Sequence, residues 1–159
     1  MSINILNDNA IFSTIGSGVF GDINLTKGTF APVKSQVIGT INQLGGTVSI
    51  TNMNGPNLYV HGTFNSSSGS LVEFIDPLTP VEYSYPYLVL DGASSIQSKL
   101  IVRFVNAIPV AVAPYCLVGT INNEIIGGQF SNVDFSWTQG NVSGVSVSTT
   151  PIAISISFK

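Results

Sequence analysis

The sequence predicts an all-β protein, and an antiparallel β-sandwich of jelly-roll or Greek-key type is the expected fold. Three observations support this prediction. Short segments alternate between apolar and polar residues, Gly, Asn and Pro turns separate them at intervals of roughly 8–12 residues, and no segment shows helical periodicity over a useful length. The pattern does not distinguish such a sandwich from a closed barrel. A β-helix is disfavoured because no short regular repeat stands out.

The N-terminal region, residues 1–30, is predicted to be a partly irregular arm. Its turn clusters, Asn7-Asp8-Asn9 and Gly16-Ser17-Gly18, separate short apolar pieces. We expect this arm to dock on its own domain or on a neighbouring subunit. Residues 31–159 are expected to form a single sandwich domain.

The first strands of that domain are expected on either side of Gly45-Gly46. Residues 35–44 and 47–51 flank this pair, which suits the positive φ angles of a type I′ hairpin turn. Further along, alternation or continuous apolar character predicts strands at 58–64, 71–75, 81–90, 99–105, 111–121, 124–126, 133–137, 145–147 and 152–158. In the last of these, Ile154 and Ile156 are expected to face the core.

Two similar blocks suggest an internal duplication. Gly39-Thr40-Ile41-Asn42 and Gly119-Thr120-Ile121-Asn122 lie 119 − 39 = 80 positions apart in a chain of 159 residues. The halves 1–76 and 77–159 are therefore candidate pseudo-repeats. The alternative is that two unrelated hairpins draw on the same biased composition.

The surface is expected to be nearly free of charge. Charged residues make up 8% of the sequence, against about 25% in typical domains, while 44% of the residues are hydrophobic. Neutral polar groups cost less to desolvate than charges, so such a surface favours contact with other protein or with sugar.

Several functional classes are disfavoured. The formal net charge is −3 and only five residues are basic, so the sequence lacks the basic footprint of a nucleic-acid-binding protein. No signal peptide or membrane-spanning segment is predicted, since the longest apolar run, residues 108–118, is short and contains two prolines. We expect the protein to be made in the cytoplasm and to act in a virion or an extracellular assembly.

No catalytic residue, metal site or cofactor is predicted. His61 is the only histidine, no nucleophile-elbow motif accompanies it, and its neighbours place it on an outer strand face. Cys116 is the only cysteine and lies in an apolar strand, where a thiol is expected to be inert. One His and one Cys make a poor zinc site.

The residues singled out as a ligand or subunit contact are Tyr83, Tyr85 and Tyr87, which share one face of an extended run. The alternative is that they cover the rim of a sheet and bind nothing. The predicted function is that of a non-enzymatic, self-assembling structural protein, such as a virion capsid, decoration or fibre subunit or a surface filament subunit. Copies of itself are the expected partners, with other structural proteins or glycans as further candidates. A lectin-like carbohydrate-binding module is the alternative function.

Overall fold

The computed structural model describes residues 1–51, 57–75, 87–105, 115–122, 124–128, 130–137, 145–151 and 153–158. Every regular element in these ranges is a β-strand, and nineteen strands are present. In the part of the chain that is described, no helix has the length and hydrophobicity of a membrane span.

The strands form three sheets, which we call A, B and C. From β1 to β18, successive strands along the chain belong to sheets A, B and C in turn, and β19 stays in sheet C with β18. Sheet A contains β1 (Ser2–Ile5), β4 (Asp22–Leu25), β7 (Ile41–Gln43), β10 (Phe64–Ser66), β13 (Ser94–Ile96) and β16 (Ile126–Gly127). Sheet B contains β2 (Ile11–Ile15), β5 (Thr29–Val33), β8 (Thr47–Thr51), β11 (Ser70–Ile75), β14 (Lys99–Phe104) and β17 (Val133–Trp137). Sheet C contains β3 (Gly18–Phe20), β6 (Ser35–Ile38), β9 (Leu58–Val60), β12 (Leu88–Leu90), β15 (Tyr115–Thr120), β19 (Ala153–Phe158) and β18 (Val145–Thr150).

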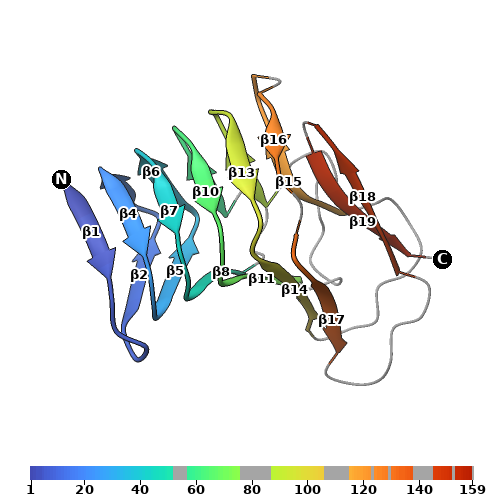
Figure 1. Cartoon of the computed structure of the whole chain (residues 1–159), viewed down its shortest axis with the longest axis horizontal. Helices are drawn as coiled ribbons and strands as arrows, with labels where there is room; N and C mark the ends of the chain where they lie inside the picture. The colour runs from blue at the N-terminus through green and yellow to red at the C-terminus, as the bar shows by residue number, and fades with distance from the viewer. Residues whose placement is uncertain are drawn as a thin grey trace.

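This arrangement is a parallel β-helix, in which each coil contributes one strand to each sheet (Figure 1). All strand pairs of sheets A and B are parallel, and only the pairs β15–β19 and β18–β19 of sheet C are antiparallel. The prediction of an antiparallel jelly-roll or Greek-key sandwich is therefore wrong. The alternation of apolar and polar residues indicates that one face of a strand is buried, but it does not indicate which strand pairs with it.

The hairpin predicted at Gly45-Gly46 is a corner of the coil. The strands on either side, β7 and β8, belong to different sheets and pair with strands of the neighbouring coils. Gly46 has a φ of +63°, and a Cβ on Gly45 would lie 2.2 Å from the carbonyl oxygen of Thr26. Two glycines here allow a tight corner against the coil below, which is the same local freedom that a hairpin turn would need.

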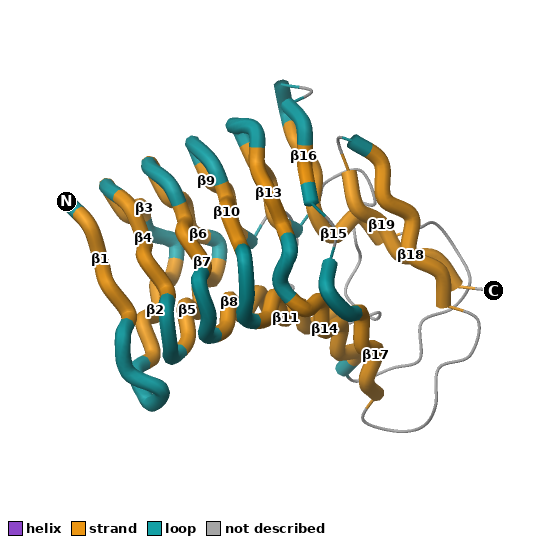
Figure 2. The backbone as a smooth tube through the Cα atoms, in the orientation of Figure 1, coloured by secondary structure: helices purple, strands orange, loops and turns teal. Residues whose placement is uncertain are grey.

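Residues 1–30, predicted to be a partly irregular arm, form β1 to β4 and the start of β5. They make up the first coil and part of the second, and Figure 2 shows them as regular strands at the N-terminal end of the solenoid. The two similar blocks occupy different positions in their coils. Ile41 begins β7 and is fully buried, whereas Ile121 follows β15 and is 53% exposed.

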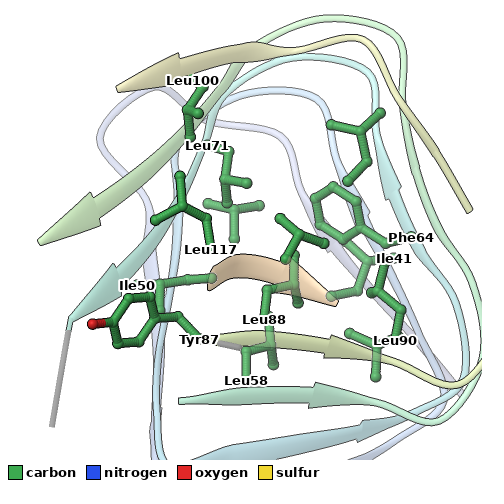
Figure 3. Packing of buried hydrophobic residues seen from close by; sticks show 14 of the residues in the cluster. Ile41, Ile50, Leu58, Phe64, Leu71, Tyr87, Leu88, Leu90, Leu100 and Leu117 are labelled. Atoms are coloured by element: carbon green, nitrogen blue, oxygen red, sulfur yellow. The ribbon is translucent and has the colours of Figure 1, made fainter. Parts of the chain in front are cut away.

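The core is built from apolar side chains stacked in columns along the axis. In sheet A, Ile23, Ile41 and Phe64 occupy successive positions of one column, and all three are fully buried. Equivalent columns run through the inward faces of the other two sheets: Val48, Leu71 and Leu100 in sheet B, and Leu58, Leu88 and Val118 in sheet C. Figure 3 shows Leu58, Leu71, Leu88 and Leu100 among the packed side chains. Each fully buried aliphatic side chain contributes about 1.5–3 kcal/mol relative to exposure.

The coils differ in length mainly at one corner. Links from sheet A to sheet B stay at three residues from β4 to β11, whereas links from sheet B to sheet C grow from one residue before β6 to twelve before β12. As a result, Ile41 lies 18 residues after its partner Ile23, but Ile126 lies 32 residues after Ser94. A repeat of such variable length leaves no fixed period in the sequence.

A column of glycines marks the corner between sheets C and A. It consists of Gly21, Gly39, Gly62 and Gly92, and a Cβ on any of the last three would lie within 2.3–2.6 Å of the carbonyl oxygen of the glycine below. The coils therefore approach each other at this corner more closely than any side chain allows.

Replacing Gly62 with alanine tests this close approach. We expect Gly62→Ala to lower the free energy of unfolding by about 1–3 kcal/mol, because the added methyl group must push two coils apart. Urea denaturation followed by circular dichroism measures the change. Gly127→Ala is the matched control, since its nearest atom would be 3.6 Å away; equal losses in the two variants would contradict the packing argument.

Candidate functional site

The predicted contact residues are not presented together on a described surface. Tyr83 and Tyr85 lie outside the described residues, in the link between β11 and β12. Tyr87 immediately precedes β12, is 3% exposed and belongs to the hydrophobic core, where Figure 3 draws it with the aliphatic side chains. A glycan or subunit contact at these tyrosines stays a prediction.

His61 lies on the outer side of the coil, where sheet C ends, and is exposed as expected. Its ring lies 4.0 Å from the ring of Tyr59, measured between centroids. One ring nitrogen, Nε2, is 3.1 Å from the amide oxygen of Gln36, and the other, Nδ1, is 3.6 Å from a carboxylate oxygen of Asp91. Asp91 also accepts a hydrogen bond from the side-chain amide of Asn122.

This cluster joins successive coils rather than preparing a nucleophile. Gln36, His61, Asp91 and Asn122 come from four consecutive turns of the solenoid. A serine-type triad requires one imidazole nitrogen to contact a hydroxyl, whereas here the two nitrogens face an amide oxygen and a carboxylate. Partial burial and the neighbouring Asp91 raise the pKa of the Tyr59 hydroxyl, which keeps it protonated.

Metal-ligating and thiol chemistry find little support. Within the described ranges, no three His, Cys, Asp or Glu side chains come close enough to hold a metal ion. Cys116 is half-buried in β15, and burial raises the pKa of its thiol even though a hydrogen bond with Ser155 lowers it. A thiol with a raised pKa is a poor nucleophile.

Glu73 is a buried carboxyl group that the sequence reasoning did not single out. It lies in β11 with its side chain in the core, between Ile50 and Val102 of the neighbouring strands, and it is 1% exposed. Neither carboxyl oxygen has a hydrogen-bond partner among the described residues. Burial raises its pKa well above the ordinary value, so the group is held in its neutral form.

The outer face of sheet A carries a polar ladder and a shallow groove. Asn42 donates a hydrogen bond to Asn24 at 3.0 Å, and Asn24 donates one to Asn4 at 2.9 Å. Beyond them lies a hollow of about 290 Å³, lined by Asn42, Leu44, Asn65, Ser66, Ser67, Ser95 and Gln97. Its lining has no aromatic ring, so it lacks the stacking surface on which sugar-binding sites commonly depend.

The N-terminal end of the solenoid carries an open apolar hollow. A hollow of about 740 Å³ lies at this end, with a lining that is apolar apart from one hydroxyl group: Met1, Ile3, Phe12, Thr14, Gly18, Val19 and Phe20. Ile3 and Phe12 pack against the core without being fully buried. The hollow is therefore the interior of the first coil, which no other described segment covers.

The strand edges around this hollow have no partner strand among the described residues. β1, β2 and β3 are the terminal strands of sheets A, B and C, and each pairs with one neighbour only. Large exposed side chains surround them: Met1, Leu6, Ile11, Ile15 and Phe20, with exposed fractions of 65–91%. The sequence carried a signal for this surface, since these apolar residues occur in a segment with a single charged side chain, Asp8.

The chain was compared with protein-family models, curated proteins and solved structures, and none of the three comparisons gave a significant match. The geometry of the chain itself must therefore carry any functional argument.

The buried carboxyl group makes stability depend on pH. The folded-state pKa of Glu73 is raised above its unfolded value. The contribution of this residue to the free energy of unfolding is therefore fully favourable below about pH 4.3. Stability is then lost progressively as the pH rises toward the folded-state pKa, because only the unfolded chain ionises over that range. We expect Glu73→Gln to remove this loss, so that the stability of the variant relative to the wild type increases as the pH rises above about 4.3.

Urea denaturation at a series of pH values measures this effect. The matched control is Glu124→Gln, which removes an exposed carboxylate. If Glu73→Gln kept the wild-type dependence on pH, the carboxyl group would have to be paired or hydrated in the folded protein.

Proposed function

We propose that this chain is a non-enzymatic structural protein that assembles with copies of itself through its N-terminal coil. The observation that carries the proposal is the ring of three unpaired strand edges around an open apolar hollow. Unpaired edges act as templates for further strands, and the addition of strands to a sheet edge is a common mode of protein recognition.

The edges lack the features that keep edge strands apart. Natural edges are blunted by charged side chains, proline, bulges or a covering segment. β1, β2 and β3 contain neither a charged residue nor a proline. The opposite end of sheet C, by contrast, is covered by the antiparallel pair β18–β19.

The apolar surface supports the same proposal. Exposed apolar patches of this kind are characteristic of interaction sites in soluble proteins. Within the described residues, half of the exposed large hydrophobic side chains lie in the first coil and its corners. If a second protein surface covered them, each Å² of apolar surface removed from water would contribute about 25 cal/mol to the free energy of association.

A charged residue at this edge should prevent assembly. We expect the wild-type chain to sediment as an oligomer, and Ile11→Lys to sediment with the mass of one chain. Ile11 is 72% exposed at the start of β2, so a lysine there leaves the folded monomer intact but would be desolvated in the assembly. Analytical ultracentrifugation over a range of concentrations provides the measurement.

Ile121→Lys is the matched control, because Ile121 is also exposed, at 53%, but lies near the other end of the solenoid. This variant should assemble as the wild type does. A wild-type chain that stays monomeric at high concentration would refute the proposal, and equal loss of assembly in both variants would place the contact elsewhere.

A further inference from the structure

We infer that two copies meet head to head, with the N-terminal coil of one chain against the N-terminal coil of the other, about a two-fold axis that crosses the middle of β2. This inference rests on the proposed function and names the surface that the partner copy presents. Three observations support it: the two ends of the solenoid are not complementary, the three strand edges match those of a second copy, and the strands at these edges carry no charged side chain.

The two ends of the solenoid are not complementary to each other. At the C-terminal end of sheet C, β15 pairs with β19 in the antiparallel sense, and β18 follows as the outermost strand. An arriving β3 of another copy would meet β18 rather than a free edge of β15. The exposed side chains along β18 are mainly serines and threonines, which do not match an apolar hollow. Continuous head-to-tail stacking is thus interrupted on one of the three sides.

A second N-terminal coil, in contrast, offers three edges in the matching triangular arrangement. A two-fold axis through the centre of β2 places β2 beside its own copy in the antiparallel sense. The same axis brings β1, with four residues, beside β3 of the other chain, with three residues. Edge donors and acceptors on all three sides can then pair, and antiparallel pairs are slightly more stable per residue than parallel ones.

Two-fold symmetry also explains the charge pattern of this coil. In an isologous contact each group near the axis faces its own copy, so an unpaired charge there would repel itself. Asp8 is the only charged side chain in residues 1–21, and it already forms an ion pair with Lys27 of the next coil at 3.2 Å. The strands β1, β2 and β3 therefore bring no unpaired charged side chain against their own copies.

The core columns can continue across such an axis. The ring of Phe12 stacks on that of the fully buried Phe30, with 5.7 Å between centroids and 18° between planes. Phe12 is the last ring of this column and lines the hollow. The axis crosses β2 at its middle, close to Phe12. The Phe12 side chains of two copies would therefore meet near the axis and cover both hollows at once.

Site-directed crosslinking tests the arrangement. In a Cys116→Ser background, Ser13→Cys places a thiol on an exposed residue at the middle of β2, and Thr149→Cys places one on exposed β18 as the matched control. A short bis-maleimide tolerates a slip in register. We expect crosslinked dimers in high yield from Ser13→Cys, few from Thr149→Cys, and no product joining the two when the variants are mixed.

A second readout uses the wild-type chain. Amide hydrogen exchange in β1, β2 and β3 should slow at high protein concentration, while exchange in β18 stays the same. Oligomers that crosslink only between Ser13→Cys and Thr149→Cys, or only through Thr149→Cys, would overturn the head-to-head arrangement but leave self-assembly standing. Monomers at every concentration would overturn the inference and the proposed function together.

Discussion

Stacking of one coil on the next is the constraint on which the rest of this structure depends. A single coil has three short strands, as few as three residues long, and cannot satisfy its backbone groups or bury its inward side chains alone. Each added coil supplies a hydrogen-bonding edge on all three sheets and extends the core columns. Residues that permit close stacking are therefore as important as those that fill the core, and the glycine column from Gly21 to Gly92 is the clearest example.

The same constraint makes the two ends of the solenoid special. An end coil has a covered side and an open side, so its edges and its interior are exposed unless something caps them. At the C-terminal end, the change from parallel to antiparallel pairing at β15–β19 breaks the regular stacking and covers one sheet. At the N-terminal end, the described chain contains no such device, and the first coil retains its interior face in solvent. The two ends therefore differ in how readily they can pair with a further strand.

The sequence predicts the all-β character, but it predicts neither the strands of residues 1–30 nor the partner of each strand. Ile154 and Ile156 face the core as the alternation of the last segment indicates, and His61 is exposed as its neighbours suggest.

Alternation depends on one strand at a time, whereas pairing depends on residues a full coil away. Because the sequence distance between paired residues of neighbouring coils ranges from 18 to 33, the repeat could be found only from its corner motif. That motif is a glycine followed two positions later by an inward residue, as at Gly21-Asp22-Ile23, Gly39-Thr40-Ile41 and Gly62-Thr63-Phe64. Glu73 could not be found in this way, since nothing in an isolated strand shows that a carboxyl group faces a closed interior.

The low charge of the chain also follows from stacking. In a parallel coil, residues at equivalent positions lie directly above one another at about 4.8 Å. Two like charges at about that distance repel by about 1–4 kcal/mol near a protein surface, so charged residues cannot be repeated along a column. Neutral residues can, and the ladder Asn4–Asn24–Asn42 shows the favourable form of such a repeat.

Two ion pairs among the described residues are consistent with this rule, since each joins opposite charges from neighbouring coils: Lys27 with Asp8, and Lys99 with Asp134. A surface of Asn, Ser and Thr is thus favoured by the solenoid itself, and composition alone does not show that other molecules cover it. What distinguishes the N-terminal coil is that its uncharged strands also have unpaired backbone edges and open onto an apolar interior. It is this combination at one place, rather than the neutral surface as a whole, that supports assembly.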